Sequence, residues 1–127
     1  MACFHFSLRK ISRSRGSVTH AIAYISASQL TDIYDGKTYD HRAKQYVDDT
    51  VIILPDNAPE EWKDLKTVTD AINASSNQPQ AILAREIEFA LPRELNPEKQ
   101  KELTVNYIRE TYVEDGRLAI ISFHSPK

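Results

Sequence analysis

Two glutamates separated by one residue stand out in the segment 82–92, which reads Ile-Leu-Ala-Arg-Glu-Ile-Glu-Phe-Ala-Leu-Pro. If this segment is a β-strand, its side chains alternate between two faces. Glu86 and Glu88 then share one face, while Ile87 and Phe89 take the other. Two neighbouring carboxylates are costly to bury without partners. The pattern therefore indicates a surface or a cation-binding cleft rather than a core.

Two other segments, 2–8 and 118–124, show the same alternation of apolar and polar side chains. In the first, His5 lies on the polar face, and in the second Ser122 and His124 do. Each of the three segments thus offers one apolar face and one face that carries His or Glu. We expect the three strands to lie close together, with these polar faces on the same side.

Tyr24 lies in the middle of a helix that the sequence predicts from the N-cap Ser17 to about Leu30. A helical tyrosine is usually a boundary residue whose hydroxyl points at water. The sharper alternative is that Tyr24 is a nucleophile, which needs a base or a metal-polarised electrophile because a phenol is un-ionised at neutral pH. His124 and the glutamate pair could supply either.

The charge of the chain is uneven, although its net value is only −2 over 127 residues. Residues 1–31 contain four basic side chains and no acid, namely Arg9, Lys10, Arg13 and Arg15. Residues 32–127 are acidic on balance. The basic cluster is a candidate surface for phosphates, and a solvated loop is the alternative.

The length and composition predict a single domain over 1–127 in a reducing compartment. Cys3 is the only cysteine, so no internal disulfide can form. The sequence contains no secretory signal and no apolar run that could cross a bilayer, so we expect no membrane association and a cytoplasmic location.

The expected element order is β-α-β-α-β-α-β, with a further hairpin allowed within 37–54. The strands are 2–8, 51–54, 82–91 and 118–124, and the helices are 17–30, 58–75 and 96–116. A basic loop, 9–16, joins the first strand to the first helix. The sequence predicts an α/β (α+β) fold, in which an antiparallel or mixed sheet carries its helices on one face.

Several segments resemble the MobA/MobL relaxases of mobilisable plasmids over essentially the whole chain. Near the N-terminus these are Met-Ala-Cys-Phe-His-Phe-Ser, Ser-Arg-Ser-Arg-Gly-Ser and Ala-Ile-Ala-Tyr. Further along they are Ile-Leu-Pro-Asp-Asn-Ala-Pro (53–59), Leu-Ala-Arg-Glu-Ile-Glu-Phe-Ala-Leu-Pro-Arg-Glu-Leu (83–95) and Ala-Ile-Ile-Ser-Phe-His (119–124). The segment 83–95 is the most specific of these matches.

The resemblance implies a nickase of the HUH type that acts on single-stranded or hairpin DNA at an origin of transfer, together with other mobilisation proteins. Tyr24 matches the tyrosine that becomes linked to the DNA 5′-phosphate and releases a 3′-hydroxyl. His124 matches the first of three histidines that bind a divalent metal, Mg or Mn. Glu86 and Glu88 match an acidic pair that ligates the metal, supports its ligands or acts as a base. Tyr34 and Tyr39 are the alternative nucleophiles.

The chain departs from this pattern after His124, where the family continues into a strand that bears His-x-His. Here the sequence ends in Ser-Pro-Lys, and His5, His20 and His41 do not replace the missing pair. We therefore expect metal binding to be weak or absent, the strand 118–124 to lack its partner, and the chain to be marginally stable and inactive alone as a metal-dependent nickase. The chain is then the front part of a longer relaxase or the product of a truncated reading frame.

Three alternatives to a relaxase remain open from the sequence. The chain could be a non-catalytic remnant that still binds DNA through its basic cluster. It could be a structural fragment without activity. It could also be an initiator of plasmid replication that uses the same HUH chemistry.

Overall fold

The computed structural model describes residues 6–12, 14, 16–44, 47–76, 78, 80–89, 94 and 96–124. Cys3, His5, Arg13 and Arg15 lie outside these residues, so the interpretations that depend on them stay predictions. The strands are β1 (Phe6–Ser12), β2 (Gln29–Thr31), β3 (Thr38–Asp40), β4 (Val47–Ile53), β5 (Ile82–Phe89) and β6 (Ala119–His124). The α-helices are α1 (Val18–Ser26), α2 (Leu65–Ala74) and α3 (Pro97–Ile108), with short helical turns η2 (Glu60–Lys63) and η3 (Arg109–Val113).

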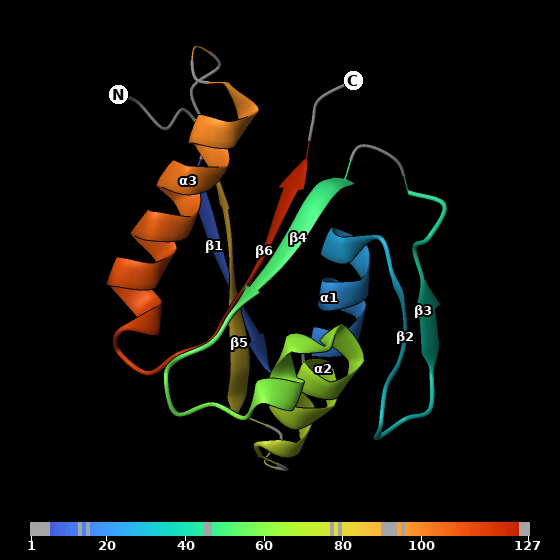
Figure 1. Cartoon of the computed structure of the whole chain (residues 1–127). Helices are drawn as coiled ribbons and strands as arrows, with labels where there is room; N and C mark the ends of the chain where they lie inside the picture. The colour runs from blue at the N-terminus through green and yellow to red at the C-terminus, as the bar shows by residue number, and fades with distance from the viewer. Residues whose placement is uncertain are drawn as a thin grey trace.

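The strands form three antiparallel pairs, β1 with β5, β4 with β6, and the short hairpin β2–β3 (Figure 1). In the first pair Arg9 lies opposite Glu86 and Ile11 lies opposite Ala84. In the second pair Ile120 lies opposite Ile52. The sequence prediction of a mixed α/β fold with antiparallel strands is confirmed.

Helices lie on both sides of β6 rather than on one face. Ile120 packs against a core cluster that α1 supplies, whereas Ala119 and Ile121 pack against a second cluster around Ile108. Adjacent residues of a strand point to opposite faces, so the two clusters lie on opposite sides of β6. Figure 1 shows the same arrangement, with α3 on one side of β6 and α1 and α2 on the other.

The first cluster is the larger and joins α1 to β1 and to the hairpin. Its buried members are Ile11, Val18, Ile22, Ala23 and Leu30. The second consists of Ile53, Ile108 and Val113.

Two boundaries near the N-terminus differ from the sequence prediction. β1 continues to Ser12, so Arg9 and Lys10 belong to a strand and not to a loop. α1 ends at Ser26, because Ala27 takes a left-handed backbone conformation with φ of 53°, and Leu30 then lies in β2. Leu30, where the predicted helix ended, is a buried residue of the hairpin instead.

The sequence analysis expected the strand 118–124 to lack its partner. This is wrong for one edge of β6, which pairs along its length with β4. The longer β4 also replaces the short strand expected at 51–54. In the part of the chain that the structure describes, no helix has the length and apolar character needed to cross a membrane.

Candidate functional site

α1 holds Tyr24 on its outer surface. The helix starts at Ser17, whose hydroxyl oxygen accepts a hydrogen bond from the backbone N–H of His20 at 3.0 Å. Val18, Ile22 and Ala23 are buried against the strands and the hairpin. Tyr24 lies outside this buried stripe and is 50% exposed, so the predicted helical position of this tyrosine is confirmed.

His124 lies at the end of β6, against the backbone of α1. Its Nε2 atom is 3.1 Å from the carbonyl oxygen of Ile25, the residue that follows Tyr24. Because Ile120 packs on the α1 cluster, alternation along the strand puts Ser122 and His124 on that same face. The histidine predicted from the sequence is therefore next to the helix that carries the predicted nucleophile.

Glu86 and Glu88 share a face of β5 with Ala84. Ala84 packs against the α1 cluster, and its strand partner Ile11 is one of the buried residues of that cluster. Alternation then places Glu86 and Glu88 on the same face, two and four residues further along. In Figure 1, β5, β6 and α1 all run toward the upper end of the molecule. The reach of the Tyr24 hydroxyl to the carboxylates stays a prediction.

Arg9 pairs with one member of the acidic pair. Its Nη2 atom lies 2.6 Å from Oε1 of Glu86, in the cross-strand position that the β1–β5 register provides. Lys10, the next residue, points to the opposite face, where its cross-strand neighbour is Arg85. The prediction that Arg9 and Lys10 lie in a basic loop is therefore wrong, because both belong to β1 and point to opposite faces. Their contact with DNA stays a prediction.

The sequence analysis missed the residues that contact the Tyr24 ring. The Nζ atom of Lys44 lies 3.4 Å from the ring centroid, and the ring of His41 meets Tyr24 edge-on at 5.3 Å between centroids. His41 in turn stacks on His20 at 5.1 Å, and His20 stacks on Tyr39 at 4.7 Å. These contacts leave no periodic pattern in the sequence, because residues 41 and 44 reach residue 24 only through the folding of the hairpin.

The side chains present fit a metal site poorly. Among the described residues, no group of three or more His, Cys, Asp or Glu side chains is placed to hold a metal ion. His124 faces a backbone carbonyl, Glu86 is paired with Arg9, and the rings of His20 and His41 are stacked on each other. A single imidazole that is not grouped with carboxylates is a weak donor set for Mg or Mn.

Comparison with known proteins identifies the family. The model of the MobA/MobL family matches residues 16–127, and the chain belongs to this family. The mobilization protein MobL of Acidithiobacillus ferridurans is 35% identical over 100% of this chain and 33% of its own length. The probable mobilization protein MobA of Bifidobacterium longum is 34% identical over 98% of this chain and 22% of its own length.

The fold has a close counterpart among solved structures. A chain from a structure described as "Molecular Basis of Vancomycin Resistance Transfer in Staphylococcus aureus" superposes with a TM-score of 0.87 at 28% identity, over 98% of this chain and 63% of that one. This chain spans about a third or less of the length of the MobL and MobA relatives. These matches define the family and the fold of the region that carries Tyr24.

Proposed function

We propose that this chain is the nucleophile-bearing part of a plasmid mobilisation relaxase, which cuts one DNA strand at an origin of transfer and remains attached to it through Tyr24. The observation that carries the proposal is the exposed phenol on α1, with His124 bound to the next peptide of the same helix. Membership of the MobA/MobL family supports it. Such a protein meets its DNA in the cytoplasm.

In the proposed step, the phenolic oxygen of Tyr24 forms a bond to the phosphorus, and the bond from phosphorus to the 3′ oxygen breaks. The DNA 5′-phosphate is then esterified to the tyrosine, and the released 3′ oxygen takes up a proton. The phenol proton passes to a base, for which Glu86, Glu88 and His124 are the candidates. Of the two acids, Glu86 is held in its strand position by the ion pair with Arg9.

A phosphorothiolate substrate tests this step without depending on a complete metal site. The reagent is a pool of single-stranded oligonucleotides, randomised around one linkage whose 3′ bridging oxygen is replaced by sulfur. A thiolate leaves more readily than an alkoxide, so attack needs less help from a Lewis acid. We expect a covalent protein–DNA adduct with the wild-type chain and none with Tyr24→Phe.

Tyr34→Phe is the matched control, because Tyr34 is 53% exposed and Tyr24 is 50% exposed. This variant should form the adduct as the wild type does. An adduct that persists in Tyr24→Phe would show that another residue is the nucleophile, and loss of the adduct in Tyr34→Phe would assign it to the hairpin.

For the metal, we propose that His124 is one ligand in the family's site and that the chain alone binds Mg or Mn weakly. When bound, the ion would polarise the scissile phosphate. With an unmodified oligonucleotide and either metal, we expect little cleavage by this chain. Efficient metal-dependent cleavage to a tyrosyl-DNA product would show that the donors on the α1 side suffice.

We also propose that the chain binds single-stranded or hairpin DNA mainly through phosphate contacts, which release counterions and weaken with salt. Lys10 and Arg85 are cross-strand neighbours on the face of the β1–β5 pair opposite to Glu86. Replacing Lys10 with Ser should weaken binding to DNA of any sequence. It should also reduce the slope of log affinity against log salt concentration by about one. An unchanged affinity would move the DNA surface away from this face.

A further inference from the structure

The turn that follows the β2–β3 hairpin brings two side chains onto one tyrosine. The backbone N–H of Lys44 donates to the carbonyl oxygen of His41 at 3.0 Å, which closes a tight turn over 41–44. Both ends of this turn contact Tyr24, His41 through its ring edge and Lys44 through its ammonium. The turn and the helix are about twenty residues apart in sequence, so this contact is a product of the fold.

Lys44 holds Tyr24 in two places. Its Nζ atom is 3.4 Å from the ring centroid, and it also donates a hydrogen bond to the backbone carbonyl of Tyr24 at 3.0 Å. An ammonium fixed to the backbone of a residue and to the face of its ring restricts the orientation of that ring. Partial burial lowers the pKa of Lys44, and a cation with fewer water contacts interacts more strongly with an aromatic face.

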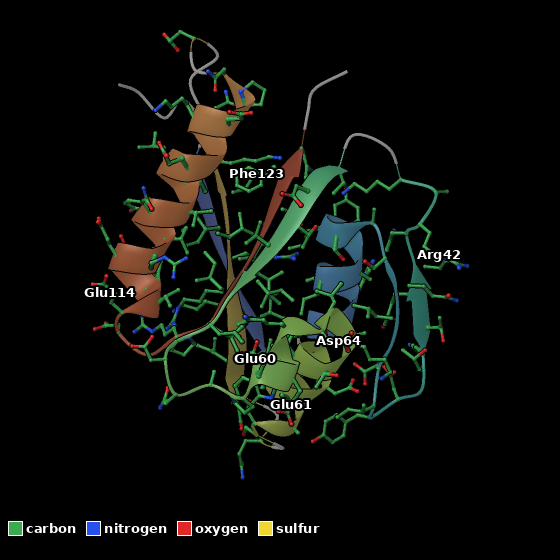
Figure 2. All side chains as sticks on the ribbon, viewed as in Figure 1. Arg42, Glu60, Glu61, Asp64, Glu114 and Phe123 are labelled. Atoms are coloured by element: carbon green, nitrogen blue, oxygen red, sulfur yellow. The ribbon has the colours of Figure 1, made fainter. Side chains whose placement is uncertain are left out.

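The turn is itself anchored to the rest of the fold. The backbone N–H of His41 donates to the carbonyl oxygen of Ser28 at 3.0 Å, which extends the pairing of β2 and β3. The side chain of Arg42 makes two hydrogen bonds to Asp40, of 2.9 and 2.8 Å. Figure 2 shows Arg42 on the outer side of β3. The position of Lys44 is therefore set by the hairpin rather than by Tyr24 alone.

We propose that Lys44 is a positioning residue for the nucleophile, which orients the Tyr24 ring and holds a positive charge beside the oxygen that attacks the phosphate. The inference rests on the proposed role of Tyr24. A preorganised charge next to a developing anion stabilises it without reorganisation during the reaction. His41 supports the same orientation from the ring edge.

The test uses N-acetylimidazole, which acetylates the oxygen of accessible tyrosines and releases imidazole. The rate at each tyrosine is read by peptide mass spectrometry on the full chain, with no DNA or metal present. Tyr34 and Tyr107 are internal standards, because they are 53% and 51% exposed and Tyr24 is 50% exposed. Exposure alone therefore predicts equal rates at the three sites.

We expect Tyr24 to react faster than both standards. Lys44→Met should slow Tyr24 about five-fold, which is the change that about 1 kcal/mol produces and the interaction of two unit charges about 4 Å apart in water. Lys44→Arg should restore most of the rate. Lys37→Met, which removes a lysine from the loop of the same hairpin, should leave all three rates unchanged.

An unaltered Tyr24 rate in Lys44→Met would overturn the proposal, as would a parallel change at Tyr34 and Tyr107, which would indicate a general loss of structure. Because the assay contains no DNA, its result is independent of the oligonucleotide experiment. A fast, Lys44-dependent Tyr24 that forms no adduct would refute the proposed strand transfer and leave the positioning contact intact.

Discussion

On the α1 side of β6, a buried chain of hydrogen bonds joins two helices to the hairpin, whereas the α3 side is held by apolar packing. In the first region Thr19 donates its hydroxyl to Asp32 at 2.9 Å, and Asn73 donates its amide to Thr19 at 2.9 Å. In the second region Ile53, Ile108 and Val113 make the core. The buried hydroxyl of Thr104 bonds within its own helix there, to the carbonyl oxygen of Gln100.

The difference matches the role proposed for the α1 side. Hydrogen bonds are directional, so a network of buried polar groups fixes one arrangement of α1, α2 and the hairpin. Apolar packing is governed mainly by volume and accepts small changes of shape. The region that carries Tyr24, His41 and Lys44 is thus the one with fixed relative positions, which is what the proposed role of Tyr24 as a nucleophile needs. On the other side, Figure 2 shows Phe123 between α3 and the β4–β6 pair, with Lys101 of α3 5.8 Å from its ring.

The largest effect is expected on the α3 side, from Ile108→Ala. Ile108 is 8% exposed, and removing most of its side chain leaves a cavity, so we expect a loss of about 3 kcal/mol in the free energy of unfolding. Ile108→Leu conserves volume and should cost about 1 kcal/mol or less. Urea unfolding of both variants measures this. Equal losses of unfolding free energy in the two variants would mean that the core on the α3 side depends on side-chain shape as well as volume.

On the α1 side, Asp32→Ala should cost about 2 kcal/mol, because the hydroxyl of Thr19 and the backbone N–H groups of Tyr34 and Asp35 lose their acceptor. Asp35→Ala is the control in the same loop, since Asp35 accepts at an exposed position from the N–H of Lys37. It should change stability little. If Asp32→Ala were as mild as Asp35→Ala, the contrast between the two regions would fail.

The sequence predicted the parts of this structure that depend on local pattern. The alternation around Glu86 and Glu88 indicated β5 and its polar face, and Pro97 after Asn96 indicated the start of α3. It could not predict which strands pair, because β4 and β6 are brought together only by the tertiary fold.

The same limit applies to the candidate site. Tyr24 was found by its resemblance to a family position, and its exposure on α1 is compatible with a nucleophile and equally with an ordinary surface tyrosine. Lys44 and His41 carried no signal, because the hairpin pairs residues 29–31 with 38–40, whereas the sequence only allowed a hairpin within 37–54. The pairing of Arg9 with Glu86 was missed for the same reason, since it depends on the register of two distant strands.

A smaller loss of stability is expected when the N-cap of α1 or of α3 is removed. These two helices lie on opposite sides of β6, so the two substitutions probe the two regions separately. Ser17 caps α1 and Asn96 caps α3, each with a side-chain oxygen that accepts a backbone N–H. Ser17→Ala and Asn96→Ala should each cost about 1 kcal/mol. Only Ser17→Ala should alter the NMR signals of the Tyr24 ring. A response of Tyr24 to Asn96→Ala would show that the two sides of β6 are coupled.

The smallest effect concerns acid and the hairpin turn. The hydrogen bonds from Arg42 lower the pKa of Asp40 from 3.8 to about 2. The ionised carboxylate therefore favours the folded turn, and its contribution is complete above about pH 3.8 and lost as the pH falls through about 2.

The carboxyl carbon of Asp40, followed by NMR, should titrate with a midpoint near 2 in the wild type and closer to 3.8 in Arg42→Gln. Lys63→Gln, which breaks the remote exposed pair with Glu60, is the control and should leave the midpoint unchanged. Because His41 follows Asp40, its ring signals should shift over the same pH range if the turn loosens. A wild-type midpoint at 3.8 would show that Arg42 does not hold the turn, and that Lys44 is positioned by the β2–β3 pairing alone.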